Sequence, residues 1–369
     1  MDSASSDHIF NSFTPATKDD WLKAAQFELD GANPFQKLTS EKDGLVILPY
    51  YDEHDTVSTS RFHLKASSNE FLGARAWHNM PILTVGNESE SNRRALSELN
   101  SGADGIILNI TSPKTDITAL LEGIEWPYCA ISFSGNISDQ FLNTLHDYAV
   151  EKKFDVGTLT GCVFRNGPFE NEDSLKLFAS WKNFHPLGIE MTKKESAAEE
   201  IASALAQAVK QIDFLTDKGL SSKQVVGAHA FYVPTGKDFF ITIAKLKVLR
   251  MLWYNVAIQF GNQSPVPIFI HASSAPWIRK EYQPNSNLIK STTAALSAVL
   301  GGCDALTIIP EESNNLKMER IARNVTSVLR EEAQLARVAD PTAGSYYLES
   351  LIDQLAEQAW RSFQKQVNV

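Results

Sequence analysis

The stretch MERIARNVTSVLREEAQLARVADPTAGSYYLESLIDQLAEQAWRSFQ, residues 318–364, decides the fold of this chain. Apolar residues recur at helical spacing on both sides of a central break, so the stretch predicts two amphipathic helices. Asp340-Pro341 is expected to end the first helix, because a residue before proline is pushed out of the α region. Residues 342–344 form the predicted turn, and Ser345 is placed to cap the second helix. The pattern alone therefore predicts two helices that close a hydrophobic core.

The composition of the chain excludes several classes of protein. Of the 369 residues 43% are hydrophobic, which is enough for a sizeable core. The net charge of −10 argues against a nucleic-acid-binding protein, because phosphates are neutralised by concentrated Lys and Arg. No apolar run approaches the roughly 20 residues needed to span a bilayer. The polar N-terminus has no basic start before an apolar core, so no signal peptide is indicated and a cytosolic location is expected.

The cysteines and histidines indicate neither a disulfide framework nor a metal site. Cys129, Cys162 and Cys303 are widely spaced, and each lies in an apolar context, which favours buried packing. The eight histidines are scattered without an H-E-x-x-H motif. We therefore expect no metal ion on this chain.

Short apolar runs alternate with longer helical stretches from Trp77 onward. Alternating strands and helices imply parallel strands joined by right-handed crossovers. Eight such units match an α/β fold of the (β/α)8 TIM barrel type, with a doubly wound open sheet as the alternative. The predicted strands are Ile82–Val85, Gly105–Ile110, Tyr128–Phe133, Phe154–Leu159, Leu187–Met191, Ala228–Val233, Val266–His271 and Ala305–Ile309. The predicted helices are 88–100, 113–124, 137–152, 170–182, 195–217, 237–260, 285–300 and 315–336.

The residues before Trp77 are predicted to form an extended and helical arm. Residues 1–12 are expected to be disordered, residues 13–76 to form the arm, and residues 77–369 to form the barrel. Thr17 is a suitable N-cap for a helix that ends at Gly31, and Leu45–Leu48 is typical of a short strand.

Both ends of the chain resemble methylmalonyl-CoA mutases. The C-terminal stretch carries R-I-A-R-N at 320–324, L-x-E-E at 329–332, D-P-x-x-G-S-Y-Y-x-E-x-L at 340–351 and A-W at 359–360. The N-terminal part carries F-x-P-x-T-x-x-x-W at 13–21 and G-L-V-I-x-P-x-Y at 44–51, and residues 239–253 resemble the long helix after the sixth strand of that family. The resemblance implies a TIM barrel with an acyl-CoA site along its axis.

The resemblance also implies that the cofactor is bound elsewhere. Active members of the family hold adenosylcobalamin on a separate C-terminal domain that carries a D-x-H-x-x-G motif. That motif does not occur here, and the chain stops at Val369, soon after the last barrel helix. We therefore expect this chain to be a short form without a cobalamin-binding domain and with no cofactor of its own.

The catalytic segment of the family is altered in this sequence. Active members carry W-T-I-R-Q-Y-A-G followed by S-N, and here Trp77 and Ser91-Asn92 keep that spacing. Between these anchors Met80 replaces the arginine and Ile82 replaces the tyrosine. Isoleucine cannot hydrogen-bond a substrate, and methionine has no charge to bind the phosphates of coenzyme A.

A third position differs after the fifth strand, where active members carry a histidine that hydrogen-bonds the thioester. The alignment, with an error of about one residue, places Met191 there. The three substitutions predict no catalytic residue on this chain. Two polar positions at the expected C-terminal face, His271 and Glu311, are candidates for a vestigial site, and Glu312 stands beside the latter.

The resemblance therefore implies the small (beta), non-catalytic subunit of methylmalonyl-CoA mutase. Its partner would be the adenosylcobalamin-dependent large subunit, in a heterodimer that interconverts methylmalonyl-CoA and succinyl-CoA, and the N-terminal arm would contact that partner. The alternative is a stand-alone TIM-barrel enzyme with a repurposed site, or an acyl-CoA-binding protein. A barrel axis filled by apolar side chains favours the subunit, and a large polar pocket on the axis favours the alternative.

Overall fold

A computed structural model describes residues 16–55, 77–167, 172–261, 268–275, 286–312 and 315–367. The predicted disorder of residues 1–12 lies outside the described residues.

Parallel strands follow one another around a ring. β3 (His78–Asn79) and β4 (Ile82–Val85) are two halves of one strand; β3 pairs with β12 on one side and β4 pairs with β5 on the other. In the same way β8 (Asn183–His185) pairs with β7, and β9 (Leu187–Glu190) pairs with β10. The remaining strands are β5 (Gly105–Ile110), β6 (Ala130–Gly135), β7 (Thr160–Arg165), β10 (His229–Pro234), β11 (Phe269–Ser273) and β12 (Ala305–Thr307). All these pairs are parallel. Each of the two split strands joins one five-stranded sheet to the other, so the sheets continue into one another as the predicted eight-stranded barrel.

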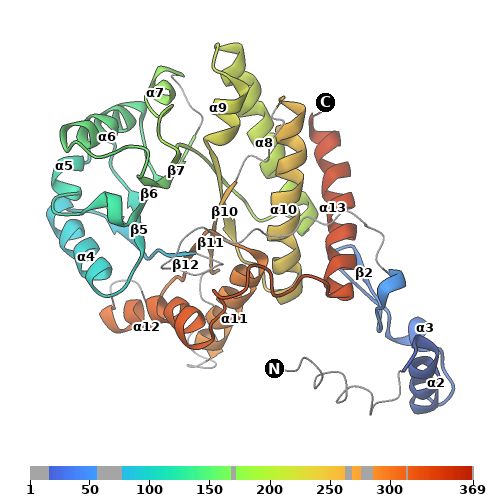
Figure 1. Cartoon of the computed structure of the whole chain (residues 1–369). Helices are drawn as coiled ribbons and strands as arrows, with labels where there is room; N and C mark the ends of the chain where they lie inside the picture. Colours follow the sequence, from blue (N-terminus) through green and yellow to red (C-terminus); the bar gives the residue numbers. More distant parts are fainter. Residues whose placement is uncertain are drawn as a thin grey trace, which may run out of the picture.

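The helices surround the strands, with α4–α7 on the left, α8, α10 and α13 on the right, and α11 and α12 at the bottom of the view in Figure 1. Side-chain N-caps such as Asn87, Ser138, Ser196 and Asp238 begin the longer helices by accepting a backbone N–H of the first turn. The helices are α4 (Glu88–Asn100), α5 (Ile117–Leu120), α6 (Asp139–Glu151), α7 (Glu172–Lys176), α8 (Ala197–Asp217), α9 (Ser222–Gly227), α10 (Phe239–Gln259), α11 (Ser286–Gly301), α12 (Leu316–Ser327) and α13 (Tyr346–Val367). Two 3₁₀ turns, η1 (Glu53–Asp55) and η2 (Trp126–Tyr128), also lie in the described ranges.

The fourth strand differs from its prediction. We expected Phe154–Leu159, but the strand is Thr160–Arg165. Lys153 takes a left-handed backbone with φ of 56°, which ends α6, and Asp155 then accepts the Gly157 N–H in a local turn. These two local bends occupy the segment in which the strand was predicted. The helix predicted at 113–124 is likewise reduced to the short α5.

The C-terminal stretch contains the two predicted helices, but the first ends early. α12 stops at Ser327 and passes into a π-helical turn, Val328–Glu332, while Gln334 adopts a left-handed φ of 54°. The irregular turn directs Arg330 to Asp104, at a distance of 2.7 Å between Nη1 and Oδ2. The predicted stop at Asp340 is therefore a turn between helices, and α13 begins after Ser345 as expected.

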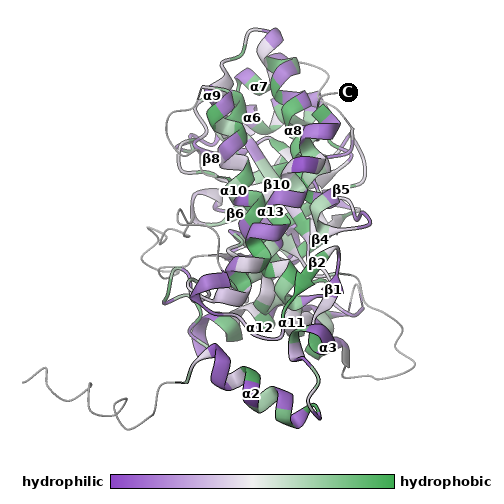
Figure 2. Cartoon of the chain, turned by 90° about the vertical axis from the view of Figure 1, so that its right-hand side faces the viewer, coloured by the Kyte–Doolittle hydropathy of each residue, from purple (hydrophilic) through white to green (hydrophobic). Residues whose placement is uncertain are grey.

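The N-terminal arm consists of α2 (Lys18–Glu28), α3 (Pro34–Leu38) and a hairpin of β1 (Ser40–Lys42) and β2 (Leu45–Ile47). The predicted N-cap Thr17 is confirmed, since its side chain accepts the Asp20 N–H. The hairpin turns at Asp43-Gly44, whose φ values of 56° and 77° suit a two-residue turn. The hairpin lies along α13, while α2 and α3 extend away from the barrel (Figures 1 and 2).

Candidate functional site

The interior of the barrel is packed with apolar side chains. Two clusters occupy it, and their fully buried members are no more than 3% exposed. An open channel for an acyl-CoA chain would leave its lining in contact with water, which these side chains are not. The clusters comprise Ile82, Ile107, Cys162, Phe164, Ala230, Tyr232 and Phe269 in one, and Met80, Ala130 and Ala305, again with Phe269, in the other.

Met80 and Ile82 both belong to this packed interior. Met80 is fully buried, and its backbone N–H donates to Leu306 O at 3.0 Å. Ile82 is partly buried and packs against the cluster of Ile107 and Phe164. The structure therefore places an apolar side chain inside the barrel at each of these two positions.

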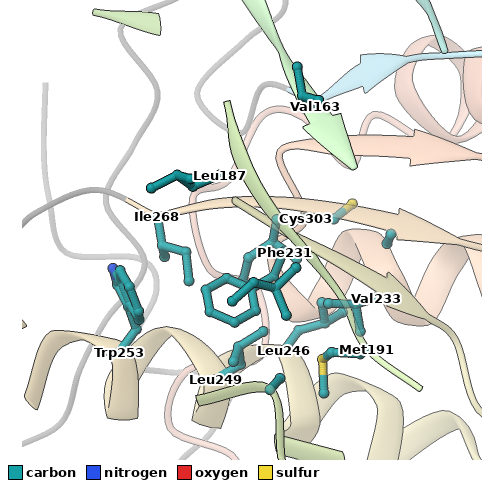
Figure 3. Close-up of a cluster of buried hydrophobic side chains, with 14 of the residues drawn as sticks. Val163, Leu187, Met191, Phe231, Val233, Leu246, Leu249, Trp253, Ile268 and Cys303 are labelled. Atoms are coloured by element: carbon teal, nitrogen blue, oxygen red, sulfur yellow. The ribbon is translucent and has the colours of Figure 1, made fainter. Parts of the chain in front are cut away.

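Met191 lies outside the barrel interior. Its side chain is 3% exposed and packs in the layer between strands and helices, near Val233 and Leu246 (Figure 3). Side chains alternate along a strand, so of the neighbours Glu190 and Met191 it is Glu190 that faces the barrel interior. The alternation with Leu187 and Ile189 was visible in the sequence and would have indicated this.

Glu190 and Tyr232 form a polar pair at the C-terminal mouth of the barrel. They are register partners on β9 and β10, and Glu190 is exposed. Burial raises the pKa of the Tyr232 phenol, and the charge of Glu190 raises it further. Tyr232 therefore stays protonated at neutral pH and offers a hydroxyl group, not a base.

His271 is buried in the middle of β11 with one hydrogen-bond partner. Its Nε2 lies 2.7 Å from Thr307 Oγ1, and that hydroxyl donates to Met80 O at 2.6 Å. Because the Thr307 proton is already used, we assign the imidazole proton to Nε2, which donates to Thr307. Nδ1 is then a buried acceptor without a partner among the described residues.

The environment of His271 keeps it neutral. Burial, the larger cause, and the neighbouring His78 together lower the pKa of His271 to about 3. The rings of Tyr232 and Phe164 lie at 5.2 Å and 6.1 Å from its own. A neutral imidazole enclosed by aromatic rings is placed to support the barrel interior, and no carboxylate in the described residues orients it as a base.

Glu311 and Glu312 serve as hydrogen-bond acceptors for local structure. Glu311 Oε1 accepts from Asn287 Nδ2 at 2.9 Å, which ties the loop after β12 to the start of α11. Glu312 Oε2 accepts from Asn315 Nδ2 at 2.6 Å, just before α12. No hydrogen bond joins either glutamate to His271 in the part of the chain that the structure describes.

The N-terminal end of the barrel carries ion pairs that the sequence did not indicate. Arg330 binds Asp104, and Arg250 Nη2 lies 2.8 Å from Asp304 Oδ2. Arg250 also donates to the backbone oxygens of Ile268 and Gly302. These contacts tie α10 and the segment after α12 to the lower edge of the strands, which is a structural role.

Cys129 and Cys162 carry no reactive thiolate. Burial raises the pKa of Cys129 to about 12 and holds the pKa of Cys162 well above its usual value. Cys162 and Cys303 are buried, as predicted, and Cys129 is partly so. Among the described residues no group of His, Cys, Asp or Glu side chains is arranged to hold a metal ion.

Within the same described ranges, every helix is too short or too polar to cross a bilayer.

Comparison with known proteins identifies relatives along the chain. The family profile described as methylmalonyl-CoA mutase matches residues 181–368. The methylmalonyl-CoA mutase small subunit of Porphyromonas gingivalis is 27% identical over 96% of this chain and 63% of its own length. That of Streptomyces virginiae is 27% identical over 89% of this chain and 58% of its own length. The chain thus spans about three fifths of each of these relatives.

Two further comparisons are weaker or shorter. The methylmalonyl-CoA mutase of Escherichia coli is 35% identical over 44% of this chain and 24% of its own length. Among solved structures, Yersinia pestis DHPS is 14% identical, with a TM-score of 0.38 over 74% of this chain and 100% of that chain. A TM-score of that size carries no weight for fold or function here.

Proposed function

The chain belongs to the methylmalonyl-CoA mutase family, and we propose that it acts in it as a small, non-catalytic subunit. In this proposal a large subunit that binds adenosylcobalamin interconverts methylmalonyl-CoA and succinyl-CoA, and this chain stabilises it. The observation that supports the proposal best is the packed barrel interior. Met80 and Ile107 are fully buried inside the barrel, where the thioester of an acyl-CoA would have to lie.

The side chains of this chain do not fit a cobalamin. The two interior clusters are apolar apart from the Tyr232 hydroxyl, and the polar side chains toward the barrel mouth, which include Asn109, Ser134 and Glu190, offer no imidazole. His271, the histidine nearest in type to a cobalt ligand, is enclosed between Thr307 and aromatic rings. We therefore propose that the partner subunit binds the cofactor and carries out the chemistry.

The arm is the surface that we assign to the partner. No residue of α2 is buried, and the side chain of Phe27 is 87% exposed. The exposed Phe27 side chain, on a helix that extends from the barrel, supports this assignment. The arm is also well attached, since the Gln354 amide bonds both the N–H and the C=O of Val46 on β2.

The alternative of an independent enzyme has little support among the described residues. His271 donates to a Thr307 hydroxyl whose own proton goes to Met80 O, so it does not act as a base toward that hydroxyl, and Glu311 accepts from the Asn287 amide. An acyl-CoA-binding role without catalysis is opposed by the same packed interior. The mutase assay distinguishes the independent enzyme and the acyl-CoA-binding protein from the subunit role.

The proposal is tested by measuring mutase turnover with adenosylcobalamin. The chain is assayed alone and after co-expression with a cobalamin-binding large subunit. We expect activity only in the pair, and we expect it to vanish when the catalytic tyrosine of the large subunit is replaced by phenylalanine. Turnover by this chain alone would contradict the proposal and favour an independent enzyme.

Two matched variants separate assembly from chemistry. Phe27→Asp on α2 is expected to weaken co-purification of the pair, while Tyr128→Asp, at an equally exposed aromatic side chain on η2, leaves it unchanged. Tyr232→Phe at the barrel mouth is expected to preserve turnover of the pair. A large loss of kcat in Tyr232→Phe, with the complex intact, would place chemistry on this chain.

A further inference from the structure

A cavity of about 440 Å³ opens at the C-terminal face of the barrel, outside the packed interior. It lies between the loop that follows β10 and the helix α11. Thr235, Ser274 and Asn287 line it and are 2–4% exposed, so its deeper wall is polar. Small-molecule sites typically have volumes of roughly 300–1,000 Å³. The cavity is therefore large enough for a metabolite.

Two lysines give this cavity a positive rim. Lys237 and Lys290 line it and are exposed, and no ion pair joins either lysine to a described residue. Within the described part of the chain the lining contains no Asp or Glu. The chain as a whole has a net charge of −10, so this is a local reversal of the overall charge. Such a rim favours an anion over a cation.

The neighbouring carboxylates are already engaged. Asp238 caps α10 by accepting the Ile241 N–H at 2.9 Å, and it forms an ion pair with Lys42. Glu311 accepts from Asn287 Nδ2 at 2.9 Å, on the side of α11 that faces the loop after β12. Asp238 is thus paired with Lys42, and Glu311, which keeps its charge, forms no ion pair with Lys237 or Lys290 among the described residues.

Hydrogen-bond donors are available in the deeper wall. The buried Thr235 hydroxyl has no partner among the described residues, and a buried polar group without a partner is costly. Ser274 Oγ accepts the Ile309 N–H at 2.9 Å, which leaves its own proton to donate. These hydroxyls, unlike carboxylates, are able to donate to an anion.

The start of α10 borders the same cavity. Gly236, Lys237 and Phe239 line it, and the 21-residue helix begins at Phe239. The N-terminus of a helix favours negative charge, because its peptide dipoles point their positive ends outward. Asp238 already accepts an N–H at this end of the helix, so the lysines and the hydroxyls are the groups that favour an anion in the cavity.

We propose that this cavity binds a small phosphate monoester. Lys237, Lys290 and the Thr235 hydroxyl would take the phosphate, while Phe239 and Ala294 contact the less polar remainder of the molecule. Two lysines without an ion-pair partner among the described residues match the two charges of a phosphate monoester better than the single charge of a carboxylate. The inference does not depend on the proposed subunit role.

The test is isothermal titration of the full chain with glycerol 3-phosphate at constant ionic strength. We expect saturable binding with one site per chain, and weaker binding of acetate. Lys237→Gln and Lys290→Gln are each expected to weaken binding about tenfold, because each removes a charged donor. Thr235→Val, which keeps the shape and removes the hydroxyl, is expected to weaken it less.

Lys182→Gln and Lys223→Gln are the matched controls. Both lysines are exposed and border a different groove, near β8 and α9. We expect glycerol 3-phosphate to bind these variants as it binds the unaltered chain. An equal loss in the controls, non-saturable binding, or acetate binding as tight as that of the phosphate would each overturn the proposal.

Discussion

Both carboxylate oxygens of Asp340 accept hydrogen bonds from the Lys247 ammonium group, each at 2.8 Å. The two side chains are 7% and 9% exposed, so the pair is almost fully shielded from water. Asp340 also accepts the N–H and the hydroxyl of Thr342. The pair thus joins the middle of α10 to the turn that precedes α13. It explains physically why the D-P-x-x-G turn of the C-terminal stretch begins with an aspartate.

Asp340→Ala is expected to destabilise the chain by about 3 kcal/mol, because it leaves the Lys247 charge buried without a partner. The measurement is unfolding in urea followed by circular dichroism. Glu357→Gln is the control: its pair with Arg361 is on the surface, with side chains 64% and 70% exposed. A loss in Asp340→Ala no larger than that in the control would mean that the buried pair contributes little.

The same pair predicts a loss of stability in acid. Burial raises the pKa of Asp340, but the hydrogen bond and charge of Lys247 outweigh burial, and the net shift is downward from 3.8. A depressed carboxyl pKa stabilises the fold above the unfolded value, and that stability is lost as the pH falls through the folded value. Asp340→Asn should therefore flatten the pH dependence of unfolding below about pH 4. A pH dependence of unfolding in Asp340→Asn that equals that of the unaltered chain in acid would contradict this assignment.

His271 predicts a second pH window. Its folded pKa of about 3 lies below the usual 6.5, so the unfolded chain binds a proton that the folded chain does not. Stability is therefore greatest above pH 6.5 and falls as the pH drops toward 3, by up to about 1.4 kcal/mol per pH unit. His271→Gln keeps a donor for Thr307 and should reduce this slope. His54→Gln, at a side chain 83% exposed, is the control expected to leave the slope unchanged.

Phe164→Ala tests whether the barrel interior is tightly packed. Phe164 is 3% exposed and lies against Tyr232 and His271, so its removal leaves a cavity. We expect a loss of about 3–5 kcal/mol in the free energy of unfolding. Phe27→Ala, at a side chain 87% exposed, is expected to change stability little. A small loss in Phe164→Ala would indicate that the interior is looser than the structure indicates.

Gln354→Ala tests the attachment of the N-terminal hairpin. The Gln354 amide accepts the Val46 N–H and donates to Val46 O, as a neighbouring strand would. Its removal is expected to speed hydrogen exchange at Val46 without altering exchange in the barrel strands. Arg361→Gln, on an exposed part of the same helix, is the control. Unchanged exchange at Val46 would show that other contacts hold the hairpin.

Sequence periodicity predicted several elements closely. The strands Ile82–Val85 and Gly105–Ile110 and the helix 88–100 have the observed bounds. Their signals are local, because an apolar run or a capped helical stripe is read within a few residues. The strand predicted at Phe154–Leu159 was wrong, since a left-handed Lys153 and the Asp155 turn displaced it to Thr160–Arg165.

The candidate positions were predicted unevenly for the same reason. Met80 and Ile82 were recognised from the spacing of their neighbours, and the structure places both inside the barrel. Met191 was placed within one residue, but one residue along a strand reverses the direction of a side chain. The pairing of His271 with Thr307 crosses between strands and had no signal in the sequence.

The sequence by itself determined the alternation of strands and helices, the order of the units and the family that the motifs near both ends of the chain resemble. These depend on periodicity, caps and turns within short segments. Only the tertiary structure decided that the barrel interior is packed, that Lys247 meets Asp340, and that Lys237 and Lys290 share one cavity. Such contacts join residues from separate units, and the distance between them is set by how helices and strands pack.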